Sequence, residues 1–136
     1  MKIELPGLKK QQQLIFEEST KAAIEQLKKN LKAPVIPGQT EVDESKYPRT
    51  HLLREHEGWE PPHQDIIGAY FRHFQQHFPD YNTDAKLADL LGLTSDRRVR
   101  EYKSASRTIP YGVWRHFLVL TGRAPQEIIE VKAFMG

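Results

Sequence analysis

The sequence has 136 residues and a formal net charge of +2, with 38% hydrophobic and 28% charged residues, which is typical of one globular domain with an accessory segment. No apolar run is long enough to span a bilayer, and a charge and a proline interrupt the first ten residues, so we expect a cytoplasmic protein. There is no cysteine, which excludes disulfides, thiolate zinc sites and cysteine nucleophiles.

The first element that the sequence predicts is an amphipathic helix from Leu8 to Lys32. Apolar residues recur along it at spacings of three, four or seven, the periodicity of one helix face. They are Phe16, Ala23, Leu27 and Leu31. Residues 1–32 are therefore expected to form an N-terminal helical segment.

Residues 33–62 are predicted to be a linker followed by a short polar segment. The stretch 33–48 holds three prolines, a glycine and an acidic run, which disfavour both a helix and a core. Residues 49–62 are polar and end at Pro61 and Pro62, where the residue before a proline is pushed out of the helical region. We expect this part of the chain to remain outside any core.

Residues 63–136 are predicted to be an all-α domain, a helix-turn-helix bundle of about five helices. A helix with a thick apolar face ends before Pro79, and a second spans 84–91, capped by Asn82 or Thr83. Gly92 ends that second helix.

Three further helices complete the expected bundle. One is capped by Thr94 and Ser95 and runs to about Ser104, another is built around Trp114, and a short last helix spans 125–131. One core is expected from Leu87, Leu91, Leu93, Val99, Tyr102, Trp114, Phe117 and Leu118.

Positive charge is concentrated in and after the third helix of this domain. From Arg97 to Arg123 the only acidic residue is Glu101. The basic residues of that stretch are Arg97, Arg98, Arg100, Lys103, Arg107, Arg115 and Arg123. Two short helices joined by a glycine turn can place a recognition helix in the major groove, so the pattern favours double-stranded DNA as partner.

The stretch from Leu87 to Trp114 resembles the helix-turn-helix of the Cro and phage-repressor (XRE-like) family, in a plasmid- or phage-borne subgroup. The matching positions are Leu87 and Ala88, Gly92 and Leu93, Val99 and Tyr102, and Ser104, Arg107 and Pro110. The sequence departs from the pattern by one extra residue before Val99, by Asp84 in place of a glutamine that touches phosphate, and by Ala105 in place of a loop glycine. The resemblance implies a transcriptional regulator, a repressor or autoregulator of a mobile element, that is not an enzyme.

Helical periodicity assigns roles to the basic residues. If Val99 and Tyr102 face the core, a polar set lies on the opposite face of the helix. The expected base readers are Arg97, Arg100, Glu101 and Ser104. Arginine can bond guanine at two atoms, and glutamate can accept from the cytosine amino group. The expected phosphate contacts are Thr94, Arg98, Lys103 and Arg107.

Other readings of the sequence are weaker. His73 and His77 have a spacing that can hold zinc, but no cysteine completes the set, so we expect no metal. Glu55, Glu57 and Glu60 stand near histidines without a nucleophile motif or a phosphate loop, so we expect neither an enzyme nor a cofactor.

Two expectations concern partners. We expect a homodimer on near-palindromic DNA, with contacts through helices after the recognition helix or through the N-terminal helix. The alternative function is a protein-interaction module, like an antitoxin, that binds a partner through the helix of residues 8–32.

Overall fold

The computed structural model describes residues 7–135, which are helical throughout their regular structure: five α-helices, four short 3₁₀ helices and no strand. The expectation of an all-α protein is confirmed. The chain divides into two units, the helical domain Gly38–Glu127 and a terminal unit that comprises residues 7–37 and 128–135 of the described chain. Among these residues no helix is both long and apolar enough to cross a membrane.

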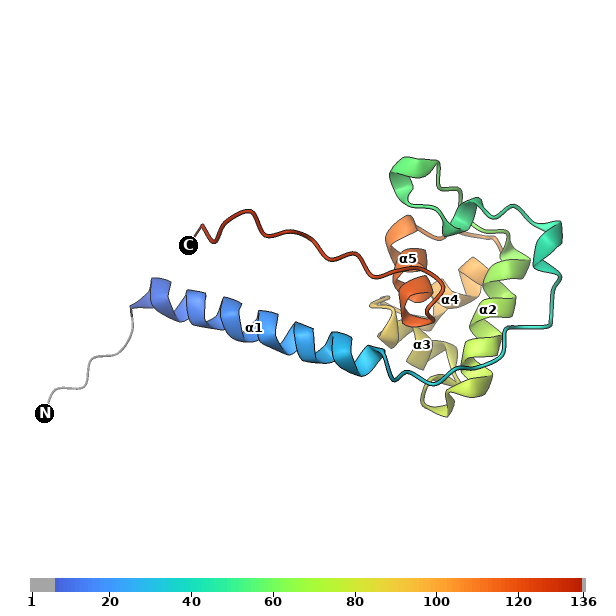
Figure 1. The fold of residues 1–136 in the computed structure, drawn as a ribbon. Coiled ribbons are helices and arrows are strands. Elements are labelled where there is room, and N and C mark those ends of the chain that lie inside the picture. The colour runs from blue at the N-terminus through green and yellow to red at the C-terminus, as the bar shows by residue number, and fades with distance from the viewer. Residues whose placement is uncertain (1–6, 136) are drawn as a thin grey trace, which may run out of the picture. The chain divides into compact units, whose positions relative to one another are not determined.

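The helical domain is built from α2 (Gln64–His77), α3 (Asp84–Leu90), α4 (Asp96–Lys103) and α5 (Tyr111–Leu120). Figure 1 shows the four helices gathered together, with residues 38–62, coloured cyan to green, running around their outside. The buried face of α2 is aromatic and aliphatic and packs around Trp114 of α5, which is fully buried. Of the eight core residues that the sequence predicts, seven are buried, and Leu93 is half-buried against them.

The turn between α3 and α4 is made by Gly92, which has a φ of +72°. Its N–H donates to the carbonyl of Asp89, and the N–H of Leu93 donates to the carbonyl of Ala88 over 2.8 Å. These two hydrogen bonds form the Schellman motif, which satisfies carbonyls at a helix end and favours glycine at the left-handed position. Thr83 caps the start of α3 by accepting from Lys86 N–H, as expected.

The end of α4 also has a residue in the left-handed conformation, but this residue is not a glycine. Ala105 has a φ of +62° and is the only residue other than glycine with a positive φ among residues 7–135. The Cβ of an L-residue crowds the backbone in this conformation, which costs about 1–2 kcal/mol. The left-handed turn after α4 is therefore occupied by a strained alanine, where a glycine would carry no such cost.

Residues 38–62 pack on the helices, although the sequence suggested a linker and a polar segment there. Short 3₁₀ helices at Glu44–Lys46, Thr50–Leu52 and Glu55–Glu57 shape the segment. Its side chains Val42, Tyr47, Leu52 and Trp59 lie against the core. The compact unit thus begins at Gly38 rather than at residue 63.

A partly buried polar network holds this segment to the helices. The Tyr70 hydroxyl of α2 donates to the Glu44 carboxylate, which also accepts from the Gln39 amide over 3.0 Å. The guanidinium of Arg123 lies 3.9 Å from the centre of the Tyr70 ring. Burial opposes ionisation of Glu44, yet the hydrogen bonds from Tyr70 and Gln39 lower the pKa of its carboxyl below the usual value.

The expected short helix at 125–131 is absent. Residues 125–135 have no regular secondary structure. Ile128, Ile129 and Val131 are β-branched and exposed, and such residues lose side-chain freedom in a helix without packing to offset it.

The terminal unit contains α1 (Leu8–Asn30) and the segment 128–135. The expected N-terminal helix is confirmed, but none of its residues is buried. The ring centres of Phe16 and Phe134 lie 5.5 Å apart, which places the end of the segment against α1. One helix and one extended segment cannot enclose a core.

Candidate nucleic-acid interface

The helix α4 is anchored by one face and exposed on the other. Val99 and Tyr102 are buried against α2 and α3, whereas Arg97, Arg100 and Ser104 are exposed. α4 begins after Ser95 without a capping bond from that side chain. The side chains of Arg97 and Arg100 are thus presented outward by a helix with a fixed orientation.

Glu101 lies at the centre of three arginines and does not project freely. Its carboxylate is 3.0 Å from Arg107 Nε, 3.4 Å from Arg97 Nε and 3.9 Å from an Arg98 Nη atom, and only 17% of the side chain is exposed. The hydrogen bond from Arg107 holds the pKa of this carboxyl below its usual value, and the charges of Arg107, Arg98 and Arg97 add to that effect. Glu101, one of the expected base readers, is thus largely covered and paired with these arginines.

Arg97 and Arg100 are the two exposed cations of α4. The Arg97 side chain is 80% exposed, and the Arg100 side chain is 56% exposed while it donates to Asp96 over 2.7 Å. That hydrogen bond lowers the pKa of Asp96 and raises that of Arg100. Because both groups lie at the surface, the pair is weak and exchangeable.

Arg98 and Lys103, two of the expected phosphate contacts, are partly covered by the rest of the domain. Lys103 Nζ lies 2.9 Å from Asp84 Oδ1, which also accepts from Gln75 of α2, and both partners of the ion pair are largely covered. Arg98 is half-buried, and its Nη1 atom has no hydrogen-bond partner among the described residues. Asp84, at the start of α3, thus ties Lys103 of α4 to that helix.

The remaining expected site residues lie at the two ends of α4. Thr94 is exposed in the turn before the helix. The Ser104 hydroxyl lies 3.3 Å from the carbonyl of Glu101 and 3.0 Å from Ser106 Oγ, at the C-cap. Arg107, in the loop that follows, is half exposed.

The structure therefore brings Arg97, Arg98 and Arg107 together around one carboxylate. Counting Arg100 and Lys103, five cationic side chains meet three carboxylates, Asp84, Asp96 and Glu101, which leaves this surface with a net charge of +2. Sequence reasoning missed the roles of Asp84 and Asp96. The spacing of four between Asp96 and Arg100 could have indicated their pairing, but no local signal links Asp84 to Lys103.

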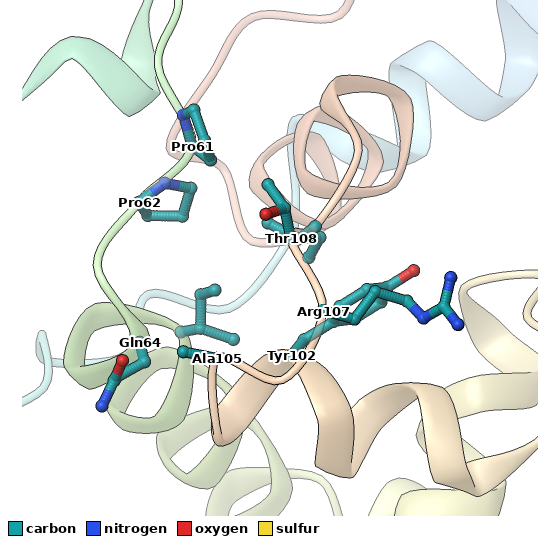
Figure 2. Close-up of a pocket in the computed structure, with 9 residues that line it drawn as sticks. Pro61, Pro62, Gln64, Tyr102, Ala105, Arg107 and Thr108 are labelled. Carbon is teal, nitrogen blue, oxygen red and sulfur yellow. The ribbon is translucent and has the colours of Figure 1, made fainter.

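A cavity of about 120 Å³ lies beside this surface, between the start of α2 and the loop after α4. Figure 2 shows Gln64 and Arg107 extending in opposite directions, so their polar ends do not converge in it. Tyr102, Ile67 and Ile109 contribute apolar surface to the lining. This arrangement lacks the convergent polar groups that orient a small ligand.

The pair of histidines on α2 does not extend to a larger cluster. The ring centres of His73 and His77 lie 4.6 Å apart. Across residues 7–135 the structure contains no group of three or more histidine and carboxylate side chains placed to hold a metal ion. No protein family, no curated protein and no solved structure matches this chain.

Proposed function

We propose that this protein binds double-stranded DNA in a sequence-specific manner, with α4 as the recognition helix in the major groove. The observation that carries the proposal is the anchoring of α4 by Val99 and Tyr102 while Arg97 and Arg100 project from its opposite face. A helix held by its apolar side and open on a basic side is the arrangement by which helix-turn-helix proteins present side chains to base edges.

In this proposal the exposed arginines divide into two groups. Arg97 and Arg100 contact base edges, with Ser104 near the end of the same face, because they project from the helix itself. Arg107 and Thr94 lie at its two ends and contact phosphates. Arg98 contributes less to the phosphate contacts, because its side chain is only 34% exposed and its Nη1 atom is buried.

Glu101 and Lys103 take different roles from those that the sequence suggested. Glu101 holds Arg97 and Arg107 in place and, as a carboxylate near phosphates, weakens binding to DNA of any sequence. Lys103 is a structural residue whose charge is balanced by Asp84.

The biological consequence of the proposal is regulation by occupancy. The protein acts in the cytoplasm as a repressor or autoregulator of a mobile element, without catalysis and without a cofactor. It binds as a homodimer, because a single recognition helix covers only a few base pairs and two copies on a near-palindrome multiply the affinity.

The test is selection of bound fragments from random duplex DNA, followed by titration of the selected and a scrambled duplex with variants. Arg97→Ala and Arg100→Ala are expected to lose about 1–3 kcal/mol on the selected duplex and much less on the scrambled one. Lys21→Ala, which removes an exposed cation of α1, is the charge-matched control and changes neither titration. If selection enriches no sequence, the proposal of sequence reading is wrong.

A second function is favoured by α1. Its exposed large apolar residues are Leu8, Leu14, Ile15 and Ile24, with Leu31 exposed at its C-cap, and none of its residues is buried. Such a helix suits an antitoxin-like module that holds a partner protein. A chain with no measurable affinity for any duplex at low salt, where phosphate attraction is strongest, would favour this function over DNA binding.

A further inference from the structure

The segment 128–135 has the properties of a strand without a partner. Its backbone is extended (Figure 1), and none of its backbone N–H and C=O groups is hydrogen-bonded to another described residue. Ile129 is 83% exposed and Val131 is 59% exposed. Unpaired extended backbone with β-branched side chains is a template for pairing with another chain.

The sequence of this segment is complementary to itself when two copies run antiparallel. Side chains alternate between the faces of a strand. One face carries Ile129, Val131, Ala133 and Met135, and the other carries Ile128, Glu130, Lys132 and Phe134. If Val131 lies opposite Val131 of a second copy, Glu130 of each chain faces Lys132 of the other, and Ile128 faces Phe134.

We propose that residues 128–135 pair with the same segment of a second copy of this chain, centred on Val131, to form a two-stranded antiparallel β-ribbon that dimerises the protein. This deepens the proposed function, because it names the surface of the homodimer, but it does not depend on DNA binding. Glu130 and Lys132 already lie on one face, with Oε2 and Nζ 2.9 Å apart, and can exchange this exposed pair for two cross-strand pairs.

The occupant is a second copy because the terminal unit is incomplete by itself. A ribbon of two strands is only marginally stable in water unless something covers it. The contact between Phe16 and Phe134 places α1 against the segment, and α1 has unburied apolar residues of its own. Two copies bring two strands and two helices together, which gives these apolar residues surfaces to pack on.

The register can be tested directly because the chain contains no cysteine. In the proposed ribbon the two Val131 Cα atoms are about 4.5–5.5 Å apart, within the range that a disulfide spans. Val131→Cys in the full-length chain, without DNA, is expected to form a covalent dimer under mild oxidation. Ala133→Cys is the matched control, since its two copies lie about 13 Å apart and cannot be bridged. Equal cross-linking of the two variants overturns the register, and so does an absence of cross-linking.

Charge reversal tests the same interface without a cross-link. Lys132→Glu places like charges opposite each other and is expected to raise the dimer dissociation constant about tenfold in sedimentation experiments. Adding Glu130→Lys to the same chain restores opposite charges and is expected to restore dimerisation. The proposal is overturned if the protein remains monomeric at all concentrations. It is also overturned if neither variant changes the dimer dissociation constant. DNA binding is measured separately, on a half-site duplex that one copy can occupy. A failure of dimerisation can therefore be told apart from a failure of DNA binding.

Discussion

Trp114 Nε1 donates a hydrogen bond of 3.2 Å to His51 Nδ1, which joins two residues 63 positions apart. The His51 ring also packs edge-on against the rings of Trp114 and Tyr70, and its carbonyl accepts from Trp59 Nε1 over 3.1 Å. His51 is 4% exposed, so its side chain is part of the core. The bond from Trp114 requires Nδ1 to be unprotonated, which makes the neutral imidazole the form that the fold accommodates.

The burial of a neutral His51 predicts that the free energy of unfolding decreases as the pH is lowered. Burial lowers the pKa of His51 from 6.5 to about 4, while the charge of Glu44 opposes the shift. In the unfolded chain the His51 imidazole is protonated below about pH 6.5, whereas in the folded chain it is protonated only below about pH 4. The contribution is fully present above pH 6.5, is lost as the pH falls toward 4, and amounts to about 3 kcal/mol at most.

The measurement is urea unfolding at several pH values between these limits. His51→Gln keeps a polar side chain without a group that titrates in this range, so its stability profile is expected to be flatter than that of the natural chain. Parallel profiles for the two proteins would contradict a buried neutral histidine.

Relief of backbone strain at Ala105 is expected to stabilise the helical domain. Ala105→Gly removes the Cβ from a residue with a φ of +62°, and part of the gain is offset by the greater freedom of glycine in the unfolded chain. The expected net increase in unfolding free energy is about 0.5–1 kcal/mol. Gly92→Ala is the reverse control, because Gly92 has a φ of +72° and an added Cβ would meet nothing within 4 Å. A loss of stability at both positions would argue against strain at Ala105.

The ion pair between Lys103 and Asp84 is expected to support folding more than DNA binding. Lys103→Met leaves a largely covered carboxylate without its cation and is expected to lower the unfolding free energy by about 1 kcal/mol. Combining it with Asp84→Asn is expected to cost less than the sum of the two single changes. In DNA titrations at several salt concentrations, Arg107→Ala lowers the salt slope by about one unit, whereas Lys103→Met leaves it nearly unchanged.

Removal of the charge of Glu101 is expected to raise affinity and reduce discrimination. Glu101→Gln frees Arg97, Arg98 and Arg107 for phosphates, so binding to scrambled DNA at low salt increases roughly tenfold. The ratio between selected and scrambled DNA falls, because the arginines lose their fixed positions. Glu55→Gln, at an exposed carboxylate of the segment 38–62, controls for the change in net charge. Equal effects of the two substitutions would show that only the net charge matters.

Local patterns were sufficient for the α-helices of residues 7–135, although they also predicted a helix at 125–131 that does not form. The spacing of apolar residues, the cap at Thr83 and the glycine at position 92 predict α2, α3 and α4, because each signal acts within a few residues of the chain. The exposure of Arg97 and Arg100 also follows from the sequence, since burial of Val99 and Tyr102 settles which side of α4 faces outward.

Contacts between distant residues decided the rest. The polar segment around His51 packs on the core only because Trp114 and Tyr70 offer it partners, and nothing in residues 38–62 alone indicates them. Lys103 pairs with Asp84 of another helix, and Glu101 pairs with Arg107 from the next loop. The sequence by itself thus determined where the α-helices that pack together form and which face of α4 is basic, because periodicity and capping are short-range effects. Only the tertiary structure decided which charges remain open to a partner, because the pairing of charges depends on distances between elements that no local pattern contains.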